Sequence, residues 1–258
     1  MLTRVGVHCR PTGKSRWKPE ANGNGDCVNG FDLRILYFFN SFANHSVNLD
    51  KMFWFFTRNS LVAGGFSFTL FWYAWFRNKH SEDQEFLFCG LFATLISLVA
   101  ARILALSLPF RLRPMHNPAL HFQLPHGVDP TGLIGWSSFP SDHATVFFCL
   151  AGIFWFVSRP LGLLALCHAI FIIVIPNIYT GIHYPTDTIA GALLGIAGAN
   201  LCKITSFRKS VTRPAFYWMR NSPGPFYAFL FLCTFEIAEL FQSIRSIVLH
   251  GMQILKLY

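Results

Sequence analysis

Two short segments place a histidine in a setting suited to phosphate chemistry. The first runs over residues 139–144, Phe-Pro-Ser-Asp-His-Ala, and puts His143 in the predicted first turn of an apolar helix. The first N–H groups of a helix have no internal partners and carry partial positive charge, so such an end binds phosphate readily. Ser141 adds a hydroxyl donor. The alternative is a helix cap formed by Ser141 or Asp142 beside an incidental histidine.

The second segment places His183 four residues before Asp187, across a Tyr-Pro-Thr turn that opens another apolar helix. A carboxylate at this spacing can accept a hydrogen bond from one imidazole nitrogen, which fixes the tautomer and leaves the other nitrogen as base or nucleophile. The alternative is a capping Asp187 and a histidine that anchors a loop at an interface. Ionisable groups at a membrane edge are costly, which favours the functional interpretation.

Two arginines follow Pro109, where an apolar run ends. The guanidinium groups of Arg111 and Arg113 are suited to bidentate contact with phosphate. The alternative is a pair of interfacial arginines whose heads reach toward water. With two histidines at helix starts on the same side, the cluster favours a phosphate site.

The elements that must position these groups are predicted to be membrane helices. The 258-residue chain is 53% hydrophobic and 13% charged, about half the charge of a typical soluble domain. We therefore expect an all-α, polytopic membrane helix bundle with about six transmembrane helices. The expected spans cover residues 60–76, 86–108, 138–158, 161–175, 188–202 and 226–247.

Three regions are expected along the chain. Residues 1–30 form a polar N-terminal tail, predicted to be mobile, and residues 31–57 form an amphipathic interfacial or partly inserted segment. Residues 58–258 form the membrane domain. The seven cysteines show no metal-type spacing and are interpreted as packing residues.

Charge distribution predicts the sidedness of the bundle. The net charge is +9, but the basic residues of 203–220 fall in one polar connection without acidic residues, which suits a cytoplasmic loop near anionic lipid rather than nucleic acid. Two spans separate the histidine segments, so both emerge on the opposite side. We expect a multi-pass protein of the cell (inner) membrane with its site facing the outer or periplasmic side.

The motifs resemble those of the type 2 phosphatidic acid phosphatase (PAP2) family, a group of membrane lipid phosphatases. That family's pattern is Lys, six residues and Arg-Pro, then Pro-Ser-Gly-His, then Ser-Arg, five residues, His, three residues and Asp. Matching residues occur in the same order over about 102–195, at Arg113-Pro114, Pro140-Ser141-x-His143 and His183-x-x-x-Asp187. The resemblance implies a His183 nucleophile that forms phosphohistidine, Asp187 as its orienting partner and His143 as the acid. It also implies phosphate binding by Arg113, Ser141 and the N–H groups near Asp142.

Three positions depart from that pattern. Leu106 stands where the family's lysine would be, and Arg102 or Arg111 is expected to supply the missing charge. Asp142 replaces the glycine of the second motif. Asn177 replaces the arginine of the third, where loss of one charged hydrogen bond costs on the order of a hundredfold in rate.

The sequence therefore predicts a metal-independent phosphatase, without cofactor, that acts on a lipid phosphate or diphosphate of the polyprenyl diphosphate or phosphatidic acid type. The expected partners are this lipid and the bilayer. Three alternatives stay open: a phosphotransferase, a catalytically impaired protein that binds anionic lipid, and a metal site. The metal site would use His116, His121, His126 and Asp129 with His143, His183 and Asp187.

Overall fold

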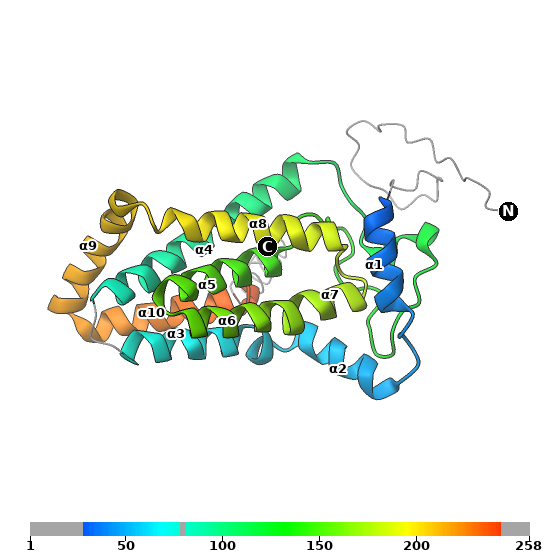
Figure 1. Ribbon diagram of the computed structural model, residues 1–258, viewed down its shortest axis with the longest axis horizontal. Coiled ribbons are helices and arrows are strands. Elements are labelled where there is room, and N and C mark those ends of the chain that lie inside the picture. The colour runs from blue at the N-terminus through cyan, green and yellow to red at the C-terminus, as the bar shows by residue number, and fades with distance from the viewer. Residues whose placement is uncertain (1–27, 78–80, 244–258) are drawn as a thin grey trace, which may run out of the picture.

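The structure is a computed structural model that describes residues 28–77 and 81–243. Its described part is an all-α helix bundle of the membrane type (Figure 1). The helices are α1 (Gly30–Asn40), α2 (Val47–Arg58), α3 (Phe66–Arg77), α4 (Ser81–Ser107), α5 (Asp142–Val157), α6 (Arg159–His168), α7 (Ile175–Tyr179), α8 (Pro185–Leu201), α9 (Thr205–Asn221) and α10 (Pro223–Ala238). A π-helical turn, Leu61–Gly65, leads into α3, and another, Ala169–Val174, joins α6 to α7. The expected 1–30 tail and the end of the sixth span lie largely outside the described residues.

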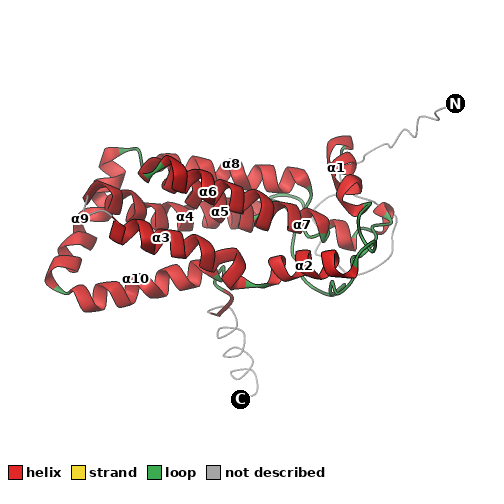
Figure 2. Ribbon diagram, turned by 60° about the horizontal axis from the view of Figure 1, so that its bottom comes forward, coloured by secondary structure: helices red, strands yellow, loops and turns green. Residues whose placement is uncertain are grey.

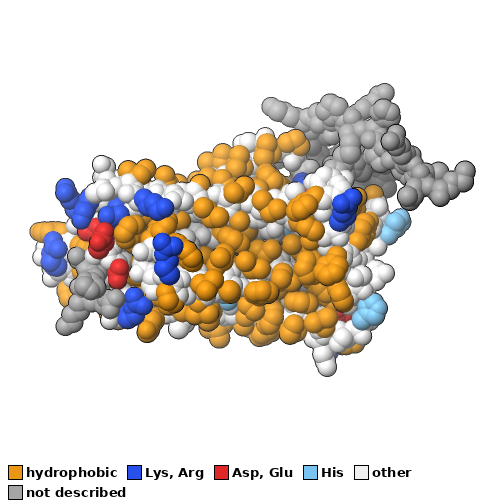
Figure 3. Space-filling view, in the orientation of Figure 1, with side chains coloured by type: hydrophobic (Ala, Val, Ile, Leu, Met, Phe, Trp, Pro, Cys, Tyr) orange, Lys and Arg blue, Asp and Glu red, His pale blue; other side chains and the backbone are white. Residues whose placement is uncertain are grey.

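Helix length and hydropathy identify the membrane-crossing part. Within the described ranges, two helices are long and apolar enough to cross a bilayer alone, Glu82–Ser107 and Arg159–Tyr179. The α8–α9 pair passes the same test together but bends by 74°, and α5 and α10 are shorter apolar helices. Hydrophobic side chains cover the middle of the molecule, with Lys and Arg gathered at the α9 end (Figure 3). The all-α membrane fold is confirmed, whereas six full-length spans are not established.

Helix α5 lies at the centre of the bundle. It packs most extensively against α8, α4 and α6. Close approach to α8 depends on glycines, because a Cβ at Gly191 would overlap the carbonyl oxygen of Ser141 and one at Gly195 would overlap that of Thr145. Small residues let helix backbones approach in this way in membrane bundles. The two helices that follow the histidine segments are thereby packed backbone to backbone.

The 203–220 region differs from the polar connection expected from sequence. It forms α9, which turns sharply from α8 and closes the far end of the bundle (Figure 2). Arg208 is buried, pairs with Glu85 of α4 at 3.4 Å and stacks over Phe86 at 4.2 Å. Lys209 bonds the other oxygen of Glu85 at 2.7 Å. Acidic partners from α4, which are distant in sequence, fold this basic run onto the bundle.

Helices α1 and α2 form the segment expected to be amphipathic. They turn at Asn44, whose φ of 65° is left-handed, and lie across the end of the bundle opposite α9 (Figure 1). Each buries one carboxylate, Asp32 in α1 and Asp50 in α2, with no exposed surface. Buried carboxylates need hydrogen-bond partners, and both find them in the 108–186 region. This segment is therefore fixed to the bundle by polar contacts.

The α5–α8 contact can be tested by adding a side chain to it. We expect Gly191→Val to lower the melting temperature by about 5 °C or more, because overpacking a buried contact typically costs about 1–3 kcal/mol. The exposed Gly224, which has open space around its Cβ position, supplies the control Gly224→Val. Thermal unfolding of both variants in detergent measures the difference. Equal melting temperatures would contradict the close α5–α8 contact.

Candidate active site

The two histidine segments meet at the end of the bundle covered by α1. The amide of Ser141 donates to the carbonyl of Asp187 at 3.1 Å, so the N-terminus of α5 lies directly against the first turn of α8. The loop before α5 is fastened to the same end, because Ser138 N donates to Arg111 O at 2.9 Å and Met115 N donates to Gly181 O at 2.9 Å. Segments far apart in the sequence thus form one site.

His183 is buried, with 4% of its surface exposed. Its Nδ1 lies 2.8 Å from the carbonyl oxygen of Ser138. A carbonyl can only accept, so Nδ1 carries the hydrogen and, in the neutral ring, Nε2 keeps its lone pair. Asp187 was expected to fix this tautomer. Its Oδ2 is 3.8 Å from Nδ1, too far for a hydrogen bond, and the backbone of Ser138 takes that role.

Asp187 is held by two other groups. Its Oδ2 accepts from the amide of Tyr184 at 2.8 Å, which caps α8, and its Oδ1 accepts from Nη1 of Arg111 at 2.5 Å. The carboxylate is fully buried and close to His183. It can therefore stabilise a positive imidazolium by charge without a direct hydrogen bond.

Arg111 occupies a different position from the phosphate contact expected of it. Its guanidinium donates to Asp187, to Thr186 Oγ1 at 2.9 Å and to Asp32 Oδ2 at 2.7 Å. Its flat face lies 4.0 Å from the centre of the Tyr184 ring. Burial opposes its charge, but Asp187 and Asp32 outweigh burial and raise the pKa of Arg111. The guanidinium therefore links two carboxylates, Asp187 and Asp32, whose charges stabilise its protonated form.

Arg113 has a buried hydrogen-bond donor without a partner. It is 6% exposed, and donates from Nη1 to Ile182 O at 2.8 Å and from Nη2 to Ser137 O at 3.3 Å. Its Nε and the hydroxyl of Ser138 are both buried without a hydrogen-bond partner. Burial lowers the pKa of Arg113 to about 10, so it stays cationic at neutral pH. Unpaired buried donors are unfavourable unless an acceptor binds them, and an oxyanion would satisfy both.

His143 and Asp142 begin α5. Ser141 caps the helix, its Oγ accepting from Ala144 N at 3.3 Å, while His143 interacts electrostatically with His183 and Arg113. Asp142 is paired with Arg102 of α4, whose Nε donates to Oδ1 at 2.9 Å. The negative charge of Asp142, one of the departures from the family pattern, is therefore neutralised by Arg102. Asp142 and Arg102 differ from the expected phosphate ligands because each satisfies the other's charge.

Asn177 was also expected at the phosphate. Its side chain turns back into its own helix, where Nδ2 donates to Ile173 O at 2.7 Å. Its carbonyl accepts from the amides of Ile182 at 2.9 Å and His183 at 3.2 Å. Asn177 thus shapes the His183 loop through its backbone and places no charge in the site.

Three contributors were not identified from sequence: Asp32, Thr186 and the carbonyl of Ser138. Asp32 lies in a segment interpreted as interfacial, although a carboxylate in an apolar helix is a signal of function. Thr186 sits between the motif residues Pro185 and Asp187. The Ser138 contribution is made by the backbone, so its side-chain identity carries no signal.

The other proposed metal ligands make contacts of their own. His116 Nε2 lies 3.0 Å from Pro130 O, and Asp129 accepts from Thr131. Over residues 28–77 and 81–243, no three His, Cys, Asp or Glu side chains are placed to hold a metal ion. The metal alternative therefore has no ligand set in this part of the chain.

Comparison with known proteins bears on the same region. Residues 86–210 match the sequence profile of the PAP2 superfamily. This stretch, just under half of the chain, is similar to the PAP2 superfamily. The bacitracin transport permease protein BcrC of Bacillus licheniformis is 36% identical over 91 residues, which make up 35% of this chain and 39% of that protein. No solved structure matches the chain.

The PAP2 region runs from α4 into α9 and contains every motif residue of the site. The match supports a relation to that superfamily, and the apolar helices agree with a membrane protein. Helices α1, α2, α3 and α10 lie outside the match.

The protonation of His183 is a direct test of the site's electrostatics. Burial lowers the pKa of His183, although Asp187 and the Ser138 carbonyl act in the opposite direction. We expect a pKa below the usual value of about 6.5, so that the neutral form with a free Nε2 persists as the pH falls below that value. Histidine NMR titration, with His183→Gln to assign the signal, measures it. A pKa above 6.5 would contradict the dominance of burial.

Proposed function

We propose that this protein is a membrane-embedded lipid phosphatase that works through a phosphohistidine intermediate. The observation that carries the proposal is the state of His183. Its Nδ1 donates to Ser138 O, so Nε2 is a nucleophile, and Arg113 and Ser138 offer unpaired buried donors at the same site. A nucleophile beside oxyanion donors is the arrangement that phosphoryl transfer requires.

In the proposed reaction, Nε2 of His183 attacks phosphorus and the bond from phosphorus to the leaving oxygen breaks. His143, in its protonated form, gives a proton to that oxygen, and the phosphorylated ring is left as a cation that Asp187 stabilises by charge. Water then attacks the phosphohistidine, His143 takes the water's proton, and phosphate leaves with His183 restored. Arg113, the Ser138 hydroxyl and the N–H groups that start α5 hold the phosphoryl oxygens.

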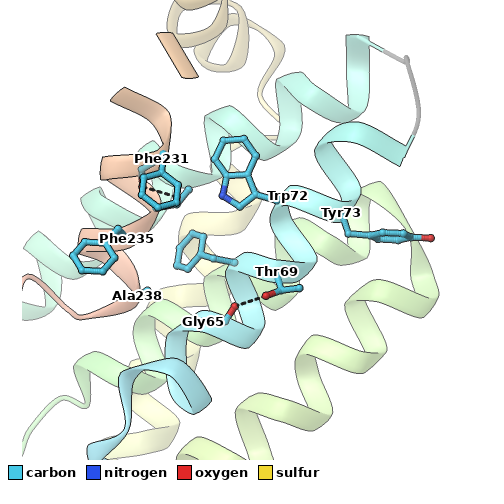
Figure 4. Close-up of a pocket in the computed structure, with 9 residues that line it drawn as sticks. Gly65, Thr69, Trp72, Tyr73, Phe231, Phe235 and Ala238 are labelled. Carbon is cyan, nitrogen blue, oxygen red and sulfur yellow. Dashed lines mark hydrogen bonds between the residues drawn. The ribbon is translucent and has the colours of Figure 1, made fainter. Parts of the chain in front are cut away.

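A groove between α3 and α10 supports a lipid as substrate. The two helices run side by side along one edge of the bundle (Figure 2), and the groove encloses about 520 Å³. Phe231 and Phe235 of α10 lie opposite Trp72 of α3 (Figure 4). Of the lining hydroxyls, those of Thr69 and Thr234 bond to backbone carbonyls of their own helices, and Tyr73 points away from the two phenylalanines (Figure 4). The groove is therefore apolar in character and suits a hydrocarbon chain.

The groove leads toward the catalytic end. Ala238, at the end of α10, lines both the groove and a small cavity of about 20 Å³ that His143 also lines. Polar residues 57–60, at the end of α2 and just after it, also line that cavity. An apolar groove next to a polar cavity lined by the proposed acid His143 suits an amphipathic lipid phosphate. The acyl or polyprenyl chain would lie between α3 and α10, with its phosphate at His143 and His183.

The sidedness follows from charge. The α9 end carries Lys203, Arg208, Lys209, Arg213 and Arg220, so the positive-inside rule assigns it to the cytoplasm. The site would then face the outer or periplasmic side of the cell membrane.

Phosphate release and trapping of the intermediate test the proposal. We expect purified protein in detergent to release phosphate from a long-chain lipid phosphate and much less from glycerol phosphate, because only the lipid fills the groove. His183→Ala should abolish turnover and the acid-labile, base-stable phosphoenzyme formed from radiolabelled substrate, whereas His45→Ala, an exposed histidine, should keep both. Phosphoenzyme in His183→Ala would contradict the nucleophile.

The Arg102–Asp142 pair supplies a second test. We expect Arg102→Ala to reduce turnover about tenfold or more, because it leaves the Asp142 carboxylate uncompensated beside the phosphate. Asp142→Gly should restore most of the activity in that background, since it removes the repelling charge. Initial rates of wild type, both single variants and the double variant measure this. A double variant no faster than Arg102→Ala would show that Arg102 acts on phosphate itself.

A further inference from the structure

Helix α1 contributes a carboxylate to the site, although it lies outside the PAP2 region. Asp32 has no exposed surface and uses both oxygens. Oδ2 accepts from Arg111 Nη2 at 2.7 Å, from Thr186 Oγ1 at 2.7 Å and from Asn29 Nδ2 at 2.9 Å. Oδ1 accepts from the amide of Thr186 at 2.8 Å. Two of these donors belong to the residue next to Asp187.

These contacts place Arg111 between two carboxylates. The guanidinium bonds Asp32 through Nη2 and Asp187 through Nη1, and the Thr186 hydroxyl bridges Arg111 and Asp32. A pair of Arg111 and Asp187 alone would be neutral. With Asp32 the three groups carry a net charge of −1, so a negative field remains next to His183.

We propose that Asp32 is a positioning residue of the phosphatase site, acting on His183 through Arg111, Thr186 and Asp187. Phosphorylation of Nε2 turns the ring into a cation, because Nδ1 keeps its hydrogen, which is bonded to the carbonyl oxygen of Ser138. A net negative cluster stabilises that cation, whereas a neutral pair would do so less. The inference rests on the proposed function and adds to it a residue from outside the matched region.

The other charges around His183 stay in place when Asp32 is changed. Asp187 comes from α8, Arg113 from the loop before α5, His143 and Asp142 from α5, and Arg102 from α4. Arg113 opposes protonation of His183 and Asp187 favours it. Removing the charge of Asp32 should therefore make His183 harder to protonate, which moves the acidic limb of the rate profile to lower pH.

Asp50 of α2 is a matched control. It has the same burial as Asp32 and also fixes the N-terminal segment to the bundle. Its oxygens accept from the Tyr179 hydroxyl, from His126 N at 3.0 Å and from Asn44 N at 3.2 Å. These bonds anchor α2 without reaching Arg111 or Asp187. A purely structural effect of losing a buried carboxylate should appear in both variants.

The experiment compares Asp32→Asn with Asp50→Asn in the full chain, using turnover of a long-chain lipid phosphate. We expect Asp32→Asn to lower kcat by at least about tenfold, the rate equivalent of one hydrogen bond to a charged group, with KM changed by less than about threefold. Its acidic limb should move to lower pH. Asp50→Asn should keep kcat within about threefold and leave the limb in place.

Equal losses in the two variants, or an unmoved acidic limb in Asp32→Asn, would overturn the inference. Should Asp32→Asn fail to fold, Thr186→Val removes the hydroxyl that joins Asp32 to Arg111, and it should lower kcat by more than Asp50→Asn does. An inactive wild type would refute the proposed function alone. The Asp32 inference would then be decided by NMR titration of His183, where Asp32→Asn should lower the pKa and Asp50→Asn should not.

Discussion

The guanidinium of Arg111 joins three parts of the chain that are remote in sequence. It comes from the loop after α4 and bonds Asp32 of α1 and Asp187 of α8, while Tyr184 covers its face. The guanidinium is only partly exposed, and the two carboxylates that it pairs with are fully buried, so those carboxylates depend on the cation for their charge compensation. The position of α1, the start of α8 and the His183 turn all depend on that pairing.

His183 shows how the backbone can set side-chain chemistry. The Ser138 carbonyl fixes the hydrogen on Nδ1, and the Asn177 carbonyl holds the amides of Ile182 and His183. Asp187 is then free to cap α8 and bind Arg111, and influences the ring through charge at 3.8 Å. Orientation and charge stabilisation are therefore supplied by different groups: the Ser138 carbonyl orients the ring, and Asp187 acts on it by charge.

The departures from the family's motifs are explained by pairing. Asp142, which replaces the glycine of the second motif, forms an ion pair with Arg102, so its added negative charge is neutralised. Asn177 brings no charge and its side chain stays in its helix. Arg113 is then the arginine at the site with an unpaired donor among the described residues, which concentrates the proposed phosphate recognition on it.

The sequence by itself determined the membrane class, the all-α fold and the resemblance to the PAP2 family, because hydropathy and the histidine spacings are local properties of the chain. It also placed His143, His183 and Arg113 at one end of the bundle, since two crossings return the chain to the same side. The roles of Arg111, Asp142 and Asn177 were decided only by the tertiary structure. Each depends on a partner that sequence separation hides: Asp32 for Arg111, Arg102 for Asp142, and the helix's own carbonyl for Asn177. Charge pairing in a buried site is fixed by which groups meet in space, and local sequence does not specify that.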